Sequence, residues 1–125
     1  MTYDEEMKQY EVLVLAAKAG RISYVPEHSK PSRSRKPWGG LWLEIKTEPV
    51  QFVRRVWNPL RDDGDALRLA NAVGMRIETP KYKGFGATAS PLREGTAGAT
   101  AFRDDPGEQL RLAITLCAAE VGKAM

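Results

Sequence analysis

The spacing of apolar residues predicts helices in three parts of the chain. The first part carries an apolar stripe at spacings of three and four residues, which consists of Tyr10, Leu13, Val14 and Ala17. Thr2 and Glu5 have the spacing of a capping box, and Gly20 can adopt the left-handed conformation that ends a helix. This pattern predicts a helix over residues 3–19.

A second helical stripe lies between a group of acidic residues and Gly74. It consists of Ala66, Leu69, Ala70 and Val73. Asp62 or Asp63 can cap its amino-terminal end, where the helix dipole favours negative charge. We therefore expect a helix from this pair of aspartates to Gly74.

The third helix has the clearest start signal. Asp105 can cap it, Pro106 suits the first helical position, and Glu108 completes a capping box. Two apolar stripes follow, with Leu110, Ala113, Ile114, Cys117 and Val121 in one and Leu112, Leu116 and Ala119 in the other. A helix that is apolar on two sides is expected either to be central to the fold or to pair with another subunit.

Short segments with alternating or β-branched apolar residues predict strands. In residues 41–46 and 75–78, aliphatic residues alternate with polar or aromatic residues, which is the period of a half-buried strand. Residues 22–25 form a short run that ends at Pro26 and also predict a strand. Residues 50–57 carry no clean period, so they predict either a strand or an irregular crossing.

Two segments lack periodicity and are expected to be mobile loops. Residues 27–40 are basic and contain two prolines, and residues 81–102 are rich in glycine, with one hairpin strand around residues 99–102. The whole pattern predicts an α/β fold in which a small, mostly antiparallel sheet of three to five strands is sandwiched between helices.

Composition places the chain among ordinary globular proteins. Its 125 residues suit a single domain, residues 1–125, and 19 Lys and Arg against 16 Asp and Glu give a net charge of +3. The longest apolar run, Val12 to Ala17, is far shorter than the roughly twenty residues of a membrane span. The acidic start differs from a secretory signal, and the single Cys117 cannot form an intramolecular disulfide. These features predict a cytoplasmic protein with no membrane partner.

Two segments carry a resemblance to a known family. Residues 57–70, WNPLRDDGDALRLA, and the stretch from Asp105 to Met125 resemble the paired signatures of the phage ABA sandwich domain proteins, which are small proteins of tailed phages and prophages. The resemblance covers residues 57–77 and 104–125 well and residues 27–56 and 80–103 hardly at all. It implies helix–sheet–helix layering and a phage origin, with the host cytoplasm as the location. It implies no activity, because the family has no established chemistry.

The chain lacks the familiar patterns for catalysis or metal binding. The acidic group Asp62 to Asp65 could suit a hard cation, but an EF-hand loop would need a glutamate where Val73 or Gly74 stands. Capping the helix is the better interpretation. His28 and Cys117 are the only imidazole and thiol, too few for a zinc site, and we interpret them as a solvated histidine and a core cysteine. We therefore predict no metal, no cofactor and no enzymatic activity.

The two loops combine positive charge with aromatic rings, as binding of a phosphorylated ligand requires. The candidate ligand-binding residues are Arg33, Arg35, Lys36 and Trp38 in the first loop, and Lys81, Tyr82, Lys83 and Phe85 in the second. Each loop would leave the end of a strand, so the two could meet at one sheet edge or across a subunit boundary. The alternative is that both are solvated loops whose Lys and Arg residues serve solubility.

Three functions of different classes fit this sequence. The first is a non-enzymatic phage counter-defence protein that sequesters an anionic, nucleotide-like small molecule, such as a nucleotide signal of host immunity. The second is a protein-binding or structural module that inhibits a host defence protein, and homo-oligomerisation is expected in either case. The third is a nucleic-acid binder that uses the basic loop, but a net charge of only +3 makes nucleic acid the weakest of the expected partners.

Overall fold

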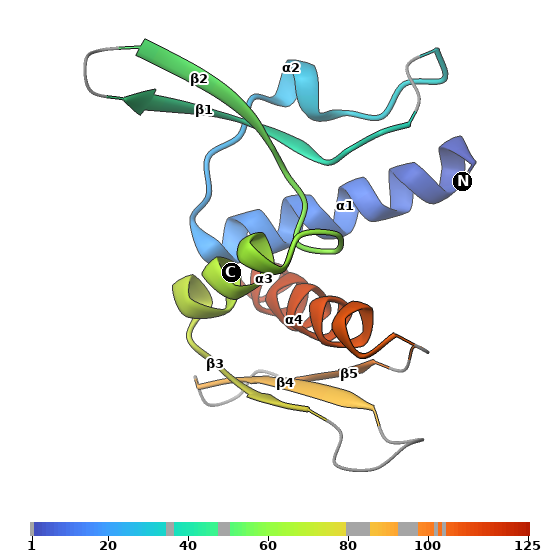
Figure 1. Ribbon diagram of the computed structural model, residues 1–125, viewed down its shortest axis with the longest axis vertical. Coiled ribbons are helices and arrows are strands. Elements are labelled where there is room, and N and C mark those ends of the chain that lie inside the picture. The colour runs from blue at the N-terminus through green and yellow to red at the C-terminus, as the bar shows by residue number, and fades with distance from the viewer. Residues whose placement is uncertain are drawn as a thin grey trace.

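Helices lie between two small sheets in this chain (Figure 1). The computed structural model describes residues 2–34, 37–47, 51–79, 86–92, 98–101, 103 and 105–125. The helices are α1 (Tyr3–Gly20), α2 (Pro26–Ser29), α3 (Asp63–Val73) and α4 (Pro106–Lys123). The strands are β1 (Leu41–Thr47), β2 (Gln51–Trp57), β3 (Met75–Glu78), β4 (Ala87–Pro91) and β5 (Ala99–Ala101). The predicted α/β class with antiparallel strands is confirmed.

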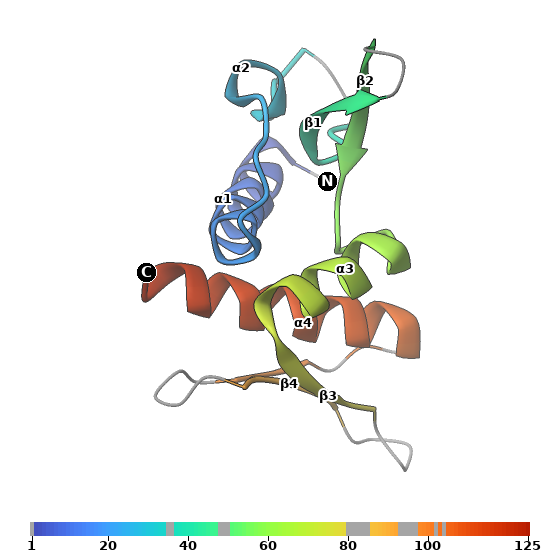
Figure 2. The ribbon, with the colours of Figure 1, turned by 90° about the vertical axis from the view of Figure 1, so that its left-hand side faces the viewer.

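The strands form two sheets rather than one. β1 and β2 make an antiparallel hairpin in which Leu41 opposes Trp57 and Ile45 opposes Val53. Leu41 and Trp57 are buried, whereas Ile45 and Val53 are exposed, so this hairpin emerges from the body of the protein. The order β3-β4-β5 makes the second sheet, which lies on the far side of α4 (Figure 2). The three main helices therefore form the middle layer.

α4 is the central element, as its two apolar stripes allow. It packs against α1 and α3 on one side and against β4 and β5 on the other (Figure 2). Small side chains permit this close packing, since Ala87 and Ala89 of β4 are buried under it. Near the carboxyl-terminal end of α4, a Cβ atom on Gly122 would overlap the carbonyl oxygen of Leu15, so α1 and α4 cross in direct backbone contact.

The predicted amino-terminal caps are present on all three long helices. The Thr2 hydroxyl accepts a hydrogen bond from the backbone N–H of Glu5 at 3.2 Å, and Asp105 accepts one from Glu108 at 2.8 Å. Asp62 accepts from the N–H groups of Gly64 and Asp65 at 2.7 and 3.1 Å. The first two helices match their predicted ends to within about one residue, and the third starts at Pro106 as predicted. Arg21 rather than Gly20 adopts the left-handed conformation that ends α1, with φ 54°. Residues 41–47, 51–57 and 75–78 are strands.

Two predictions near the loops are wrong. Residues 22–25 are not a strand, because Pro26 begins the short helix α2 and only the N–H of Val25 bonds to β1, at 2.8 Å from the Trp42 oxygen. Within residues 81–102, the expected strand near residue 99 is β5, but β4 was expected to be loop. Apart from Thr88, β4 consists of residues with low strand propensity, and tertiary packing under α4 decides its conformation.

Candidate functional site

A groove between α1 and the start of α4 is the best-formed candidate site. Its volume is about 530 Å³, within the roughly 300–1,000 Å³ of small-molecule sites. Three segments supply its walls: α1, the turn that follows β2, and α4 with the residue Arg103 just before it. The lining residues are Lys8, Gln9, Val12, Leu60, Arg61, Arg103, Glu108, Arg111, Leu112 and Leu116.

The turn after β2 places Leu60 and Arg61 at the groove. The backbone N–H of Arg61 donates to the carbonyl oxygen of Asn58 at 3.1 Å, and the Asn58 side chain accepts from the N–H of Leu60 at 3.0 Å. Asn58 also donates to the carbonyl oxygen of Gly39 at 2.9 Å, which attaches the turn to the residues before β1. The local Asn-Pro sequence thus folds as an Asx-type turn whose last residues face the helices.

Arg111 stabilises the groove through hydrogen bonds and ion pairs with protein groups. Its Nη1 lies 2.6 Å from Asp63, its Nε donates to the Leu60 carbonyl oxygen at 3.0 Å, and its Nη2 lies 4.0 Å from Asp105. These contacts connect α4 with α3 and with the turn. Arg111 is therefore a structural cation, and its charge is neutralised before any ligand arrives.

Lys8 and Arg61 are the cations that remain available. Within the described part of the chain, Lys8 has neither an ion-pair nor a hydrogen-bond partner. Arg61 uses one Nη1 donor, in a long hydrogen bond of 3.3 Å to the carbonyl oxygen of Trp38. A guanidinium has five N–H donors, so most of those on Arg61 can bind an anion.

Apolar side chains and one carboxylate complete the groove. Val12, Leu60, Leu112 and Leu116 come from all three walls and supply its apolar surface. Arg103 and Glu108 form an ion pair whose Nε to Oε1 distance of 3.6 Å is longer than a hydrogen bond. The groove thus offers apolar contact, positive charge and one acidic group to a ligand.

Two of the predicted ligand-binding residues fall in the described part of the chain. Arg33 lies over the ring of Tyr3, 4.7 Å from the ring centroid, in a cation–π contact at the start of α1. Trp38 is buried, its indole N–H donates to the Ser29 carbonyl oxygen at 2.8 Å, and its ring meets Tyr10 edge-on. The Trp38 ring belongs to the core, and this corrects its expected role as an open stacking surface.

The other six candidates, Arg35, Lys36, Lys81, Tyr82, Lys83 and Phe85, lie outside the described residues. Their flanking strands can still be compared. The first loop leads into β1, whereas the second connects β3 with β4, and these strands belong to sheets on opposite sides of the helical layer (Figure 1). The expectation that both loops leave one sheet edge is therefore wrong for a single chain, and a site shared between subunits stays a prediction.

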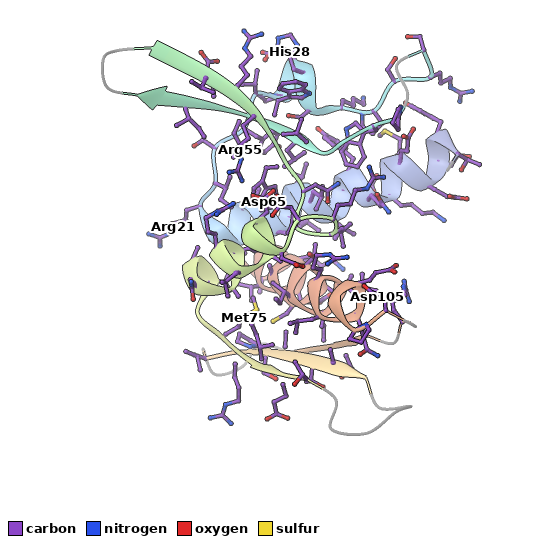
Figure 3. All side chains as sticks on the ribbon, viewed as in Figure 1. Arg21, His28, Arg55, Asp65, Met75 and Asp105 are labelled. Atoms are coloured by element: carbon purple, nitrogen blue, oxygen red, sulfur yellow. The ribbon has the colours of Figure 1, made fainter. Side chains whose placement is uncertain are left out.

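The acidic group before α3 has structural partners. Asp62 caps the helix, and Asp63 pairs with Arg111. Asp65 is buried and accepts hydrogen bonds from Arg55, from Arg68 at 2.9 Å and from the backbone N–H of Asn58 at 3.0 Å, and Figure 3 shows Arg55 above it on β2. Among the described residues, no group of three or more His, Cys, Asp and Glu could hold a metal ion.

The single thiol and the single imidazole are in different layers. Cys117 is buried in α4, and burial raises the pKa of its thiol, which disfavours the reactive thiolate. His28 lies on α2, on the opposite side of α1 from α4 (Figure 3). A Cys–His pair of the kind that activates a nucleophile is therefore not formed by these two residues.

Sequence reasoning missed the groove, although one signal for it was present. Leu112 and Leu116 belong to the predicted second apolar stripe, but their partly buried position in one groove with Lys8 and Arg61 depends on how α1 crosses α4. Ala119, the third residue of that stripe, is buried within the chain.

No described helix has the length and apolar character needed to cross a membrane. Comparison with protein-family models, with curated proteins and with solved structures finds no match to this chain.

Proposed function

We propose that this protein captures an anionic, nucleotide-like small molecule in the groove between α1 and α4. The observation that carries the proposal is the position of two available cations, Lys8 and Arg61, beside apolar side chains that line the same groove. A phosphate requires charged N–H donors, and a planar base requires apolar surface. The groove supplies both in a volume of suitable size.

The proposed role is binding without turnover. The groove holds cationic and apolar side chains, and its one acidic residue, Glu108, is paired with Arg103. Such a set can hold a charged ligand and exclude it from other proteins. The resemblance implies a phage origin and no activity, and counter-defence in the host cytoplasm, by sequestering a nucleotide signal, is the role that fits such an origin.

Fluorescence titration with 8-anilinonaphthalene-1-sulfonate, an aromatic sulfonate, tests this proposal. We expect the dye to bind the native protein and to bind Lys8→Gln and Arg61→Gln about tenfold or more weakly, because a hydrogen bond to a charged group contributes roughly 1.5–3 kcal/mol. Arg76→Gln is the matched control, since Arg76 is an exposed arginine on β3, in the sheet beyond α4. Equal dye affinity in all four proteins would exclude the groove as the binding site.

Self-association is a second candidate function, favoured by the exposed part of the β1–β2 hairpin. Ile45 and Val53 are cross-strand partners on one face of this hairpin, and both are exposed. An isolated two-stranded hairpin is marginally stable in water, so pairing with the same hairpin of a second copy would stabilise it. Analytical ultracentrifugation should then show a dimer that Val53→Lys converts to a monomer, and a native monomer would exclude this function.

A further inference from the structure

Glu108 is chemically exceptional among the residues that line the groove. Of the described lining residues it alone is acidic, whereas Lys8, Arg61, Arg103 and Arg111 are basic. Its side chain is 53% exposed, and its one ion-pair contact among the described residues is with Arg103, at 3.6 Å. A site that bound only the anionic part of a ligand would gain nothing from this carboxylate, because it repels negative charge.

A second group in the groove also has unused acceptor capacity. Gln9 lines the groove, and its Oε1 is buried with no donor among the described residues. A buried acceptor without a partner is costly, and a ligand that supplies a donor removes that cost. Glu108 and Gln9 together indicate a ligand that carries N–H donors in addition to its negative charge.

We infer, on the basis of the proposed function, that the groove prefers guanine nucleotides and that Glu108 is the residue that recognises the base. An ionised carboxylate is acceptor-only and has two oxygens. Guanine presents two adjacent donors to such a group, the N1–H and the 2-amino group. Adenine presents an amino group beside an acceptor nitrogen on the same edge, and the carboxylate would repel that nitrogen.

The Arg103–Glu108 pair supports this assignment, because guanine resembles the guanidinium group of Arg103, which is the present partner of Glu108. The N1–C2–N2 edge of guanine carries parallel N–H donors in the same arrangement as a guanidinium. A guanine base can therefore take the place of the Arg103 guanidinium at Glu108.

Calorimetric titration with GMP, IMP and AMP tests the inference on the full chain. We expect GMP to bind about tenfold to a hundredfold more tightly than AMP, since each hydrogen bond to a charged acceptor contributes roughly 1.5–3 kcal/mol. IMP should fall between them, because it keeps the N1–H and lacks the 2-amino group. In Glu108→Gln, the preference should move toward AMP, because a glutamine side chain pairs well with the donor and acceptor of adenine.

Glu120→Gln is the matched control, since Glu120 lies on the same helix and pairs with Lys123 away from the groove. It should bind GMP as the native protein does. Equal affinity for GMP and AMP, or an unchanged preference in Glu108→Gln, would overturn the inference. Failure of all three nucleotides to displace the sulfonate dye would also overturn it. If dye binding still required Lys8 and Arg61 in that case, the groove would remain an anion-binding site, and only the guanine preference would be wrong.

Discussion

The Nη1 of Arg61 donates a hydrogen bond of 3.3 Å to the carbonyl oxygen of Trp38. The backbone N–H of Trp38 in turn donates to Oε2 of the buried Glu6 on α1, at 3.0 Å. Trp38 therefore connects α1 with the turn that carries Arg61. This contact joins the basic loop that the sequence singles out to the groove that the structure reveals, and it orients one of the two available cations.

Replacing Trp38 by Phe should destabilise the protein by about 1–3 kcal/mol, because it removes the donor to the buried Ser29 carbonyl oxygen. Urea denaturation measures the change in the free energy of unfolding. Trp42→Phe is the control, since Trp42 is only half-buried. Equal unfolding midpoints for the two variants would show that the Trp38 hydrogen bond contributes nothing.

Asp65→Asn should lower the free energy of unfolding by about 2 kcal/mol. The substitution removes the charge shared by Arg55 and Arg68 and places an amide beside the N–H of Asn58. Breaking a fully buried pair costs roughly 3–5 kcal/mol, and the value here is smaller because the arginine side chains are 39% and 60% exposed, so water screens them. Asp63→Asn, at an exposed position, should change the unfolding midpoint much less.

The cap at the start of α3 should make stability depend on acid pH. The backbone N–H of Asp65, followed by that of Gly64, holds the pKa of Asp62 below its usual value of 3.8. A lowered pKa in the folded state adds stability that is present above 3.8 and is lost as the pH falls through the lower, folded value. At neutral pH, Asp62→Ala should cost about 1 kcal/mol.

Asp62→Asn separates the charge from the hydrogen bond at this cap, because asparagine also caps helices well. Unfolding curves recorded over a range of acid pH should show the native protein losing its advantage over Asp62→Asn as the pH drops. A difference that stayed constant down to strongly acid pH would contradict the assigned origin of this stabilisation.

Leu116→Asp should weaken ligand binding more than it weakens the fold. Leu116 is half-exposed in the groove, so water can reach a carboxylate there, and we expect a cost of about 1–2 kcal/mol rather than that of a fully buried charge. The same carboxylate repels an anion, and sulfonate-dye affinity should fall about tenfold or more. Leu67→Asp, on the exposed face of α3, is the control and should leave the dye affinity unchanged.

Cys117 should be inert in the native protein. Burial raises the pKa of its thiol, and thiol reagents need both access and thiolate. A colorimetric disulfide reagent at mildly alkaline pH should therefore react only after the chain is unfolded in guanidinium chloride. Rapid reaction of the native protein would place Cys117 at a solvent-accessible position.

The helices were predictable because their start signals are local. Thr2, Asp62 and Asp105 each bond to N–H groups two or three residues ahead, so neither the cap nor the first turn depends on distant parts of the chain. The strand β4 had no such signal. Its residues, ATASP, become a strand because α4 covers them and β3 and β5 pair with them on both sides.

The groove was not predictable for a related physical reason. Lys8 and Leu116 are far apart in the chain, and nothing in their own neighbourhoods indicates that they line the same groove. The concentration of Arg, Lys and aromatic residues in the two loops predicted a ligand-binding site there instead. Trp38 shows how that signal can mislead, because an aromatic residue in a polar segment can also anchor the segment to the core.

The backbone contact between Gly122 and Leu15 has a consequence for the design of binding variants. α1 and α4 cross steeply (Figure 2), and Lys8 and Glu108 lie on the two helices well away from the crossing point. A larger residue at position 122 would separate the helix axes there and so change the width of the groove without replacing any residue that lines it. Ligand size and ligand chemistry could then be varied separately, the first at one glycine and the second at the lining side chains.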